Sequence, residues 1–264
     1  DANGARPIHH AAANSNNPGV LTSILRETLG SSKHGGDLFV KDVWNNLPVH
    51  YAAKFATSDE TARVLMRGAG RLCMWWWKQL STANADGMCA IHCVADRHGD
   101  YAAGSATLAR TILALAETPQ ALLRQPTAAV EEGDELLAVH IAAECNAPVL
   151  KVFLDTGGPE QTRLLDRHGN LPIHYAGLNE DIDALKSILD VVGPAQLLEA
   201  NRFGNHTIHY AAQHNRNDAV LDLILQTGGL EQLATRNMNG MEPLHCAAKR
   251  QDSATAMTLM LNCD

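Results

Sequence analysis

The sequence predicts an all-α repeat solenoid, in which each unit is a tight turn followed by two antiparallel helices. One observation behind this prediction is a segment that recurs seven times along the 264 residues and holds a histidine at a fixed place. The other is an apolar run with helical spacing after these segments. Periods of about 20 to 50 residues are typical of solenoids, because stacked units bury a shared core.

The seven segments align on an aliphatic residue followed by histidine. They read GARPIHHAA, NNLPVHYAA, GMCAIHCVA, ELLAVHIAA, GNLPIHYAG, GNHTIHYAA and GMEPLHCAA. The histidines are 41, 42, 48, 34, 35 and 36 residues apart, and they are His9, His50, His92, His140, His174, His209 and His245. Small residues follow at the second and third positions, with Val94 the larger exception, as expected where two helices approach closely.

The turn and the first helix come first in each unit. A glycine five residues before the histidine suits a turn that needs positive φ, at Gly4, Gly87, Gly169, Gly204 and Gly240. A proline two residues before the histidine suits the first helical position, at Pro7, Pro48, Pro172 and Pro243.

The second helix is predicted from the apolar runs VLTSILRETL, TARVLM, TLARTILALA, VLKVFL, ALKSIL and AVLDLIL. Asn17-Pro18 reads as a helix cap followed by a first-turn proline. Glycines are placed to end these helices, at Gly30, Gly68, Gly157, Gly193 and Gly228.

Together these segments resemble the Thr-Pro-Leu-His-x-Ala signature of the ankyrin-repeat family, whose unit has about 33 residues. The resemblance covers essentially the whole chain and implies one ankyrin-repeat solenoid. Its repeats would span approximately residues 1–39, 40–82, 83–130, 131–164, 165–199, 200–235 and 236–264. Because the chain lacks an initiator Met and begins in a turn-like segment, we expect a piece of a longer protein.

The chain departs from the family pattern in two ways. The first three periods exceed the family unit by about 8, 9 and 15 residues, which predicts enlarged loops in the first three repeats. The hydroxyl that braces the histidine in the family is absent, because the threonine position holds Arg6, Leu47, Cys89, Leu137, Leu171, His206 and Glu242.

Composition excludes several classes of function. A formal charge of −8, from 29 acidic and 21 basic residues, argues against a nucleic-acid or membrane-binding surface. The apolar stretch ATLARTILALA is too short to span a bilayer, so we expect no membrane insertion. Six cysteines without a CxxC pair indicate reduced thiols, and with no signal sequence they predict an intracellular, cytoplasmic or nuclear protein.

No constellation of residues indicates catalysis or a cofactor. Seven of the thirteen histidines belong to the repeat and are interpreted as structural, and the other six are scattered without zinc-ligand spacing. Cys89 and Cys93 around His92 could pass for an activated thiol, but both occupy packing positions of the repeat. We therefore expect no enzyme within these residues, no cofactor and no metal.

Partner contacts are expected on the concave side, where turns and first helices lie in such solenoids. Trp75, Trp76 and Trp77, with Trp44, are the best candidates for a contact anchor, although one or two rings could instead pack under the long loops. The other candidates are expected to be exposed because of their position in the repeat: Lys54, Phe55, Asp96, Arg97, Glu132, Asp134, Glu144, Asn179, Arg202, Phe203, Gln213, Met241 and Arg250.

The leading functional hypothesis is a non-catalytic module that binds an unknown protein or peptide on this face. An alternative is a recruiting segment of a larger enzyme or effector whose catalytic domain lies outside this sequence. A third is an architectural spacer or self-associating scaffold. The oligomeric state is left open by the sequence.

Overall fold

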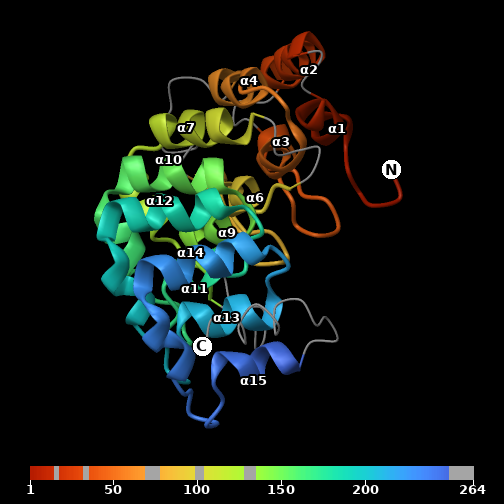
Figure 1. The fold of residues 1–264 in the computed structure, drawn as a ribbon. Helices are drawn as coiled ribbons and strands as arrows, with labels where there is room; N and C mark the ends of the chain where they lie inside the picture. The colour runs from red at the N-terminus through yellow and green to blue at the C-terminus, as the bar shows by residue number, and fades with distance from the viewer. Residues whose placement is uncertain (15–17, 32–35, 69–77, 99–103, 128–134, 250–264) are drawn as a thin grey trace. The chain divides into compact units, whose positions relative to one another are not determined.

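The computed structural model describes residues 1–264 apart from 15–17, 32–35, 69–77, 99–103, 128–134 and 250–264 (Figure 1). The described residues form short α-helices and 3-10 helices and contain no β-strand beyond an isolated bridge between Pro126 and Leu137. The chain forms two compact units, of which unit 1 is Asp1–Ala138 with Asp155–Gly157 and unit 2 is Val139–Leu154 with Gly158–Asp264.

Unit 1 is built from pairs of antiparallel helices. The first helices pack in a row, α1 against α3 and α3 against α6, and the second helices pack likewise, α2 against α4 and α4 against α7. The first helices are α1 (Pro7–Ala13), α3 (Pro48–Phe55) and α6 (Ala90–Ala95). The second helices are α2 (Pro18–Ser31), α4 (Glu60–Gly68) and α7 (Ser105–Leu115), and η1 (Gly36–Phe39) and α8 (Pro119–Leu123) are short additional turns.

Unit 2 repeats this pattern, with α11 against α13, α13 against α15 and α12 against α14. Its first helices are α9 (Ala138–Cys145), α11 (Pro172–Ala176), α13 (Thr207–His214) and α15 (Pro243–Ala248). Its second helices are α10 (Ala147–Gly157), α12 (Ile182–Val192) and α14 (Asp218–Gly228). Most residues of α9 and α10 belong to this unit.

Apolar residues between the helix layers form the core of each unit. In unit 1, Ile8, Leu21 and Leu65 belong to one buried cluster. In unit 2, Ile173 and Ile224 are fully buried. No helix among the described residues is long and apolar enough to cross a lipid bilayer.

The predicted all-α repeat fold is confirmed at the level of its helices. The first helices α1, α3, α11 and α15 begin at the predicted prolines. The apolar runs lie in α2, α4, α7, α10, α12 and α14. Helices α10 and α14 end one residue later than predicted. Gly157 and Gly228 are their last helical residues, and the following Gly158 and Gly229 have positive φ.

A 3-10 helix that was not predicted from the sequence follows three of the second helices. These 3-10 helices are η3 (Pro159–Arg163), η4 (Pro194–Leu198) and η5 (Leu230–Ala234). Each buries a glutamine, and these side chains, Gln161, Gln196 and Gln232, are at most 1% exposed. The amide of Gln196 donates to the carbonyl of Thr162 at 2.9 Å, which ties consecutive 3-10 helices together. The signal for them was the recurrence of GPEQ, GPAQ and GLEQ.

The turns before α1, α3, α6, α11, α13 and α15 each contain a residue with positive φ. The five predicted glycines have φ between 71° and 75°, and Asn45 takes the same place before α3 with φ 61°. Asparagine tolerates this left-handed conformation better than other residues with a side chain, which explains the exception.

Gly204→Ala is expected to lower the free energy of unfolding by about 2 kcal/mol, because the new Cβ meets both left-handed strain and a neighbour. That Cβ would lie 3.0 Å from the amide nitrogen of Met238 in the next turn. Gly240→Ala is the matched control, since its φ of 71° brings the same strain but nothing lies within 4 Å of its Cβ. Urea denaturation of both variants would measure the difference, and equal losses would contradict the steric part of the explanation.

Candidate functional site

Each signature histidine occupies the third position of its first helix. In six of them Nδ1 accepts a hydrogen bond from the backbone N–H of the residue before the helix. This bond is 2.9 Å long from Leu47 to His50 and 3.0 Å from Leu171 to His174. Further pairs have the same bond: Arg6 with His9, Cys89 with His92, His206 with His209, and Glu242 with His245. The ring thus satisfies a helix N-terminus, as the glutamate of a capping box does.

The Nε2 of six signature histidines bonds to a backbone carbonyl in the segment that follows. The partners are Val40 and Asn46 for His9, Thr82 for His50, Gln125 for His92, Leu164 for His140, Glu199 for His174 and Met241 for His209, at 3.0 to 3.2 Å. Backbone groups therefore brace the histidines in place of the missing hydroxyl. Accepting at Nδ1 and donating at Nε2 requires the neutral ring.

Burial lowers the pKa of His50, His92 and His174 to about 4, because it disfavours the charged form of the ring. Such histidines remain neutral at physiological pH and are fully used by the scaffold.

Cys89 supplies a thiol where the family has a hydroxyl. Its Sγ lies 2.9 Å from Nδ1 of His92. Burial raises the pKa of the Cys89 thiol to about 11, so the thiolate needed for nucleophilic chemistry is disfavoured. Cys93 is also buried. The geometry agrees with the interpretation of both cysteines as packing residues.

An aspartate or asparagine eight residues before the histidine forms hydrogen bonds that stabilise each described turn. This role was not predicted from the sequence. The side-chain Oδ1 accepts the backbone N–H groups two and four residues later, as Asp42 does from Trp44 at 2.9 Å and from Asn46 at 2.7 Å. The same pair of bonds is made by Asp1, Asn84, Asp166, Asn201 and Asn237. The constant spacing to the histidine was the available signal.

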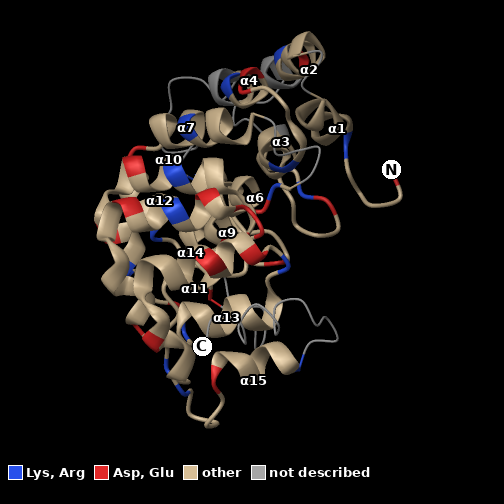
Figure 2. Cartoon of the chain, viewed as in Figure 1, with Lys and Arg blue, Asp and Glu red and all other residues tan. Residues whose placement is uncertain are grey.

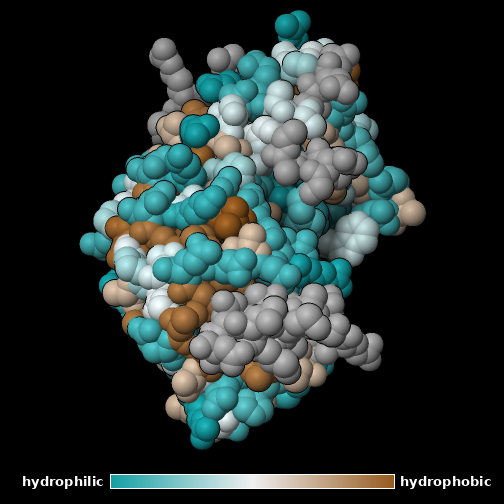
Figure 3. Space-filling model, viewed as in Figure 1, coloured by the Kyte–Doolittle hydropathy of each residue, from teal (hydrophilic) through white to brown (hydrophobic). Residues whose placement is uncertain are grey.

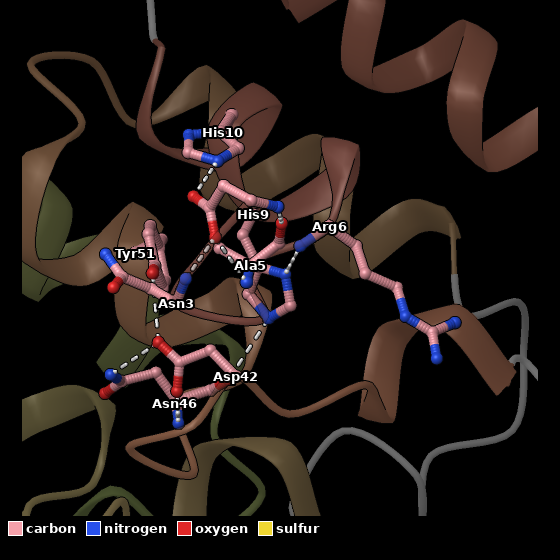
Figure 4. A network of polar contacts seen from close by, with 9 residues as sticks. Asn3, Ala5, Arg6, His9, His10, Asp42, Asn46 and Tyr51 are labelled. Carbon is pink, nitrogen blue, oxygen red and sulfur yellow. Dashed lines mark hydrogen bonds and ion pairs between the residues drawn. The ribbon is translucent and has the colours of Figure 1, made fainter.

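In unit 1 these turns join into a polar network (Figure 4). Asp42 accepts hydrogen bonds from the Tyr51 hydroxyl at 2.9 Å and from the Asn46 side chain at 3.0 Å. Burial alone would raise the pKa of Asp42, but its hydrogen bonds from Asn46, Tyr51 and Trp44 outweigh burial and lower it. These bonds connect the turn that carries Trp44 to α3.

A groove of about 380 Å³ opens next to this network within unit 1. Residues of two consecutive turns and of α3 and the end of α6 line it: Trp44, Asn46, His50, Tyr51, Lys54, Phe55, Asn84, Asp86, Met88, Cys93 and Asp96. The groove combines an aromatic wall with three charged side chains.

The aromatic wall comes from one turn and one helix. The rings of Tyr51 and Phe55 pack with centroids 5.9 Å apart on α3. Trp44 projects from the turn and is 47% exposed. Its carbonyl accepts the backbone N–H of Ala85 in the next turn at 2.7 Å, so the backbone that presents the indole is fixed.

The charged residues of the groove are Lys54, Asp86 and Asp96. Lys54 and Asp86 are exposed, and Asp96 is half-buried. Burial raises the pKa of Asp96, although electrostatic interactions with His98 and Lys54 oppose the rise. In the described parts of the chain, neither the Lys54 ammonium nor the Asp96 carboxylate has a hydrogen bond or an ion pair.

Four of the predicted partner-binding residues meet in this groove: Trp44, Lys54, Phe55 and Asp96. The predictions for Trp75, Trp76, Trp77, Glu132, Asp134 and Arg250 lie outside the described residues. Asp86 and Met88 were not predicted to line the groove, although their place in the turn DGM just before α6 was a usable signal.

Two candidates were wrongly expected to be exposed. Arg97 is 2% exposed, and burial lowers the pKa of its guanidinium to about 10. Asn179 is 8% exposed because it serves the scaffold. Its side chain donates to the carbonyl of Ala143 at 3.0 Å and accepts from the N–H of Asp181. The repeat pattern placed both residues at the end of a first helix, where burial depends on the neighbouring segment.

The remaining candidates belong to unit 2. Glu144, Arg202 and Phe203 are exposed, while Gln213 and Met241 are half-buried. The ring of Phe203 packs on His168 with centroids 5.7 Å apart.

The helices of unit 2 differ in charge (Figure 2). The second helix α12 carries both acidic and basic residues, whereas the first helix α13 has no Lys, Arg, Asp or Glu. Apolar atoms show on the surface near α12 and α14 (Figure 3).

The stacked helix pairs, the turns and the bracing histidines define the ankyrin-repeat fold. Solved structures of that fold match the chain over nearly its full length. The human ASB11 ankyrin repeat domain matches with a TM-score of 0.69 and 16% identity, covering 98% of each chain. The ankyrin repeat domain of Bcl-3, described as a unique member of the IkappaB protein family, matches with a TM-score of 0.60 and 18% identity, covering 98% of this chain and 99% of that one.

These likenesses are structural. No protein-family model matches the sequence. No curated protein matches it either.

Proposed function

We propose that this chain is a non-catalytic protein-binding module that holds a segment of a partner protein in the groove of unit 1. The observation that carries the proposal is the groove itself, where a half-exposed tryptophan stands beside Phe55, Lys54 and Asp96. Tryptophan is enriched among the few residues that dominate the binding energy of protein interfaces, and such residues cluster in well-packed pockets.

The arrangement of the scaffold supports a binding role over a catalytic one. Nδ1 and Nε2 of His50 and His92 are both engaged by the backbone, which leaves neither ring free to act as a base. The thiols of Cys89 and Cys93 are buried. Ankyrin repeats use the extended surface formed by stacked turns and helices for recognition, and the groove lies on such a surface.

Exposed residues of unit 2 extend the proposal. Glu144, Arg202 and Phe203 remain candidate contacts for a larger partner. The free cysteines among the described residues, Cys89, Cys93, Cys145 and Cys246, support an intracellular, reducing compartment as the place of binding.

Trp44→Ala is expected to weaken partner capture at least about tenfold, because truncating an interface tryptophan typically costs roughly 2 kcal/mol. The change should leave stability nearly unaltered, since Trp44 makes hydrogen bonds through its backbone alone among the described residues. The measurement is affinity capture from lysate of the source cell, quantified by mass spectrometry.

Leu115→Ala is the control for that capture, because Leu115 is 43% exposed in unit 1 and does not line the groove. A protein retained by the wild type and by the control but lost with Trp44→Ala supports the proposal. Capture of the same proteins in equal amounts by all three contradicts it.

A further inference from the structure

We propose that the groove receives an arginine side chain of the partner, whose guanidinium pairs with the carboxylates of Asp96 and Asp86 while its plane lies against the aromatic wall. This inference rests on the proposed function of the groove and specifies the chemistry of the segment bound there.

The charge of the groove favours a cationic ligand. Its lining residues carry two carboxylates and one ammonium. Asp96 is half-buried without a hydrogen bond or ion pair in the described residues, and burial raises its pKa. The effect of burial on Asp96 outweighs the favourable electrostatic influence of His98 and Lys54 nearby, so a ligand cation in direct contact with the carboxylate would offset the remaining desolvation cost. Asp86 is an exposed carboxylate close enough to influence the ionisation of Asp96.

The aromatic wall selects arginine among the cations. A guanidinium is planar, stacks on aromatic faces and donates two parallel hydrogen bonds to a carboxylate, whereas an ammonium is a strongly hydrated point charge. Trp44, Tyr51 and Phe55 offer the ring surfaces. The Tyr51 hydroxyl is already bound to Asp42, so this residue presents its ring and not its polar end.

Lys54 restricts the sequence around the arginine. Its exposed ammonium lines the same groove and has no ion pair within the described part of the chain. It would repel a second cation beside the first, so the expected ligand is a single arginine and not a basic tract. The net charge of −8 would still attract a partner segment that is basic at this one position.

The test selects phage-displayed random peptides on the whole chain and measures the affinity of the best binder as a synthetic peptide. We expect the enriched peptides to share one arginine. Replacing that arginine by citrulline, which keeps the shape and removes the charge, should weaken binding at least about tenfold. Asp96→Asn should weaken it by a similar factor, whereas Lys54→Ala should leave it unchanged or tighter.

The variants separate this inference from the proposed function. The Asp96→Asn protein keeps the side-chain shape, and an unchanged thermal midpoint would show that it remains folded. Peptides that need Trp44 but tolerate both citrulline and Asp96→Asn would overturn the arginine inference and leave the binding groove in place. Failure to enrich any peptide, or peptides indifferent to Trp44→Ala as well, would overturn both.

Discussion

Acidification from pH 7 to pH 5 is expected to lower the free energy of unfolding by about 2 kcal/mol for each of His50, His92 and His174. Each of these rings has a pKa near 4 in the folded chain against an ordinary value of 6.5. Below pH 6.5 these histidines therefore bind protons in the unfolded chain but remain neutral in the folded chain. Their stabilising contribution is complete above pH 6.5 and is lost progressively as the pH falls toward 4.

Urea denaturation at several pH values would measure this loss and give the number of protons taken up on unfolding. His174→Gln serves as the control, because it removes one titrating ring and should reduce the proton uptake at pH 5 by about one. An unfolding free energy that stays constant between pH 7 and pH 5 would contradict the buried, neutral state assigned to the histidines.

His174→Ala is expected to lower the free energy of unfolding by about 3 kcal/mol. The substitution leaves the N–H of Leu171 and the carbonyl of Glu199 without the ring that bonds both. It also opens a cavity at a residue that is 1% exposed and removes the ring contact with Tyr210, 5.8 Å between centroids.

Chemical denaturation compares this variant with Gln226→Ala, which changes an exposed side chain on α14. The control should alter stability by less than about 0.5 kcal/mol, as is usual for surface substitutions. If the two variants unfolded at the same urea concentration, the structural role of the signature histidine would be wrong. Adding Pro172→Ala should increase the loss, because that proline fixes the start of α11.

Much of the fold was predictable because the repeat constrains backbone and side chain together. Glycine before the helix, proline at its start and alanine after the histidine each have a local physical reason that the sequence displays. The 3-10 helices were harder to predict, since a segment such as GPEQ has no apolar periodicity and is specified by a buried glutamine. The turn carboxylates and amides were missed because Asp42 reads as a solvated residue until the turn folds around it.

The groove was predictable in part. Trp44, Lys54, Phe55 and Asp96 follow from their positions in the repeat, because turns and first helices present side chains to the same surface. Burial at the ends of first helices was not predictable, because it depends on how closely the adjacent segment approaches. Arg97 shows this limit most clearly, as a charged residue that is 2% exposed.

The bonds from Nε2 to a later carbonyl all point the same way along the chain. Each ring depends on the segment that follows it, whereas no such bond ties a ring to the segment before it among the described residues. Losing a segment would thus uncover the histidine that precedes it, let that ring take up a proton and loosen its own helix start. Within each unit, acid-driven opening should consequently have a polarity and spread toward the N-terminus, and amide hydrogen exchange would record it as a graded loss of protection.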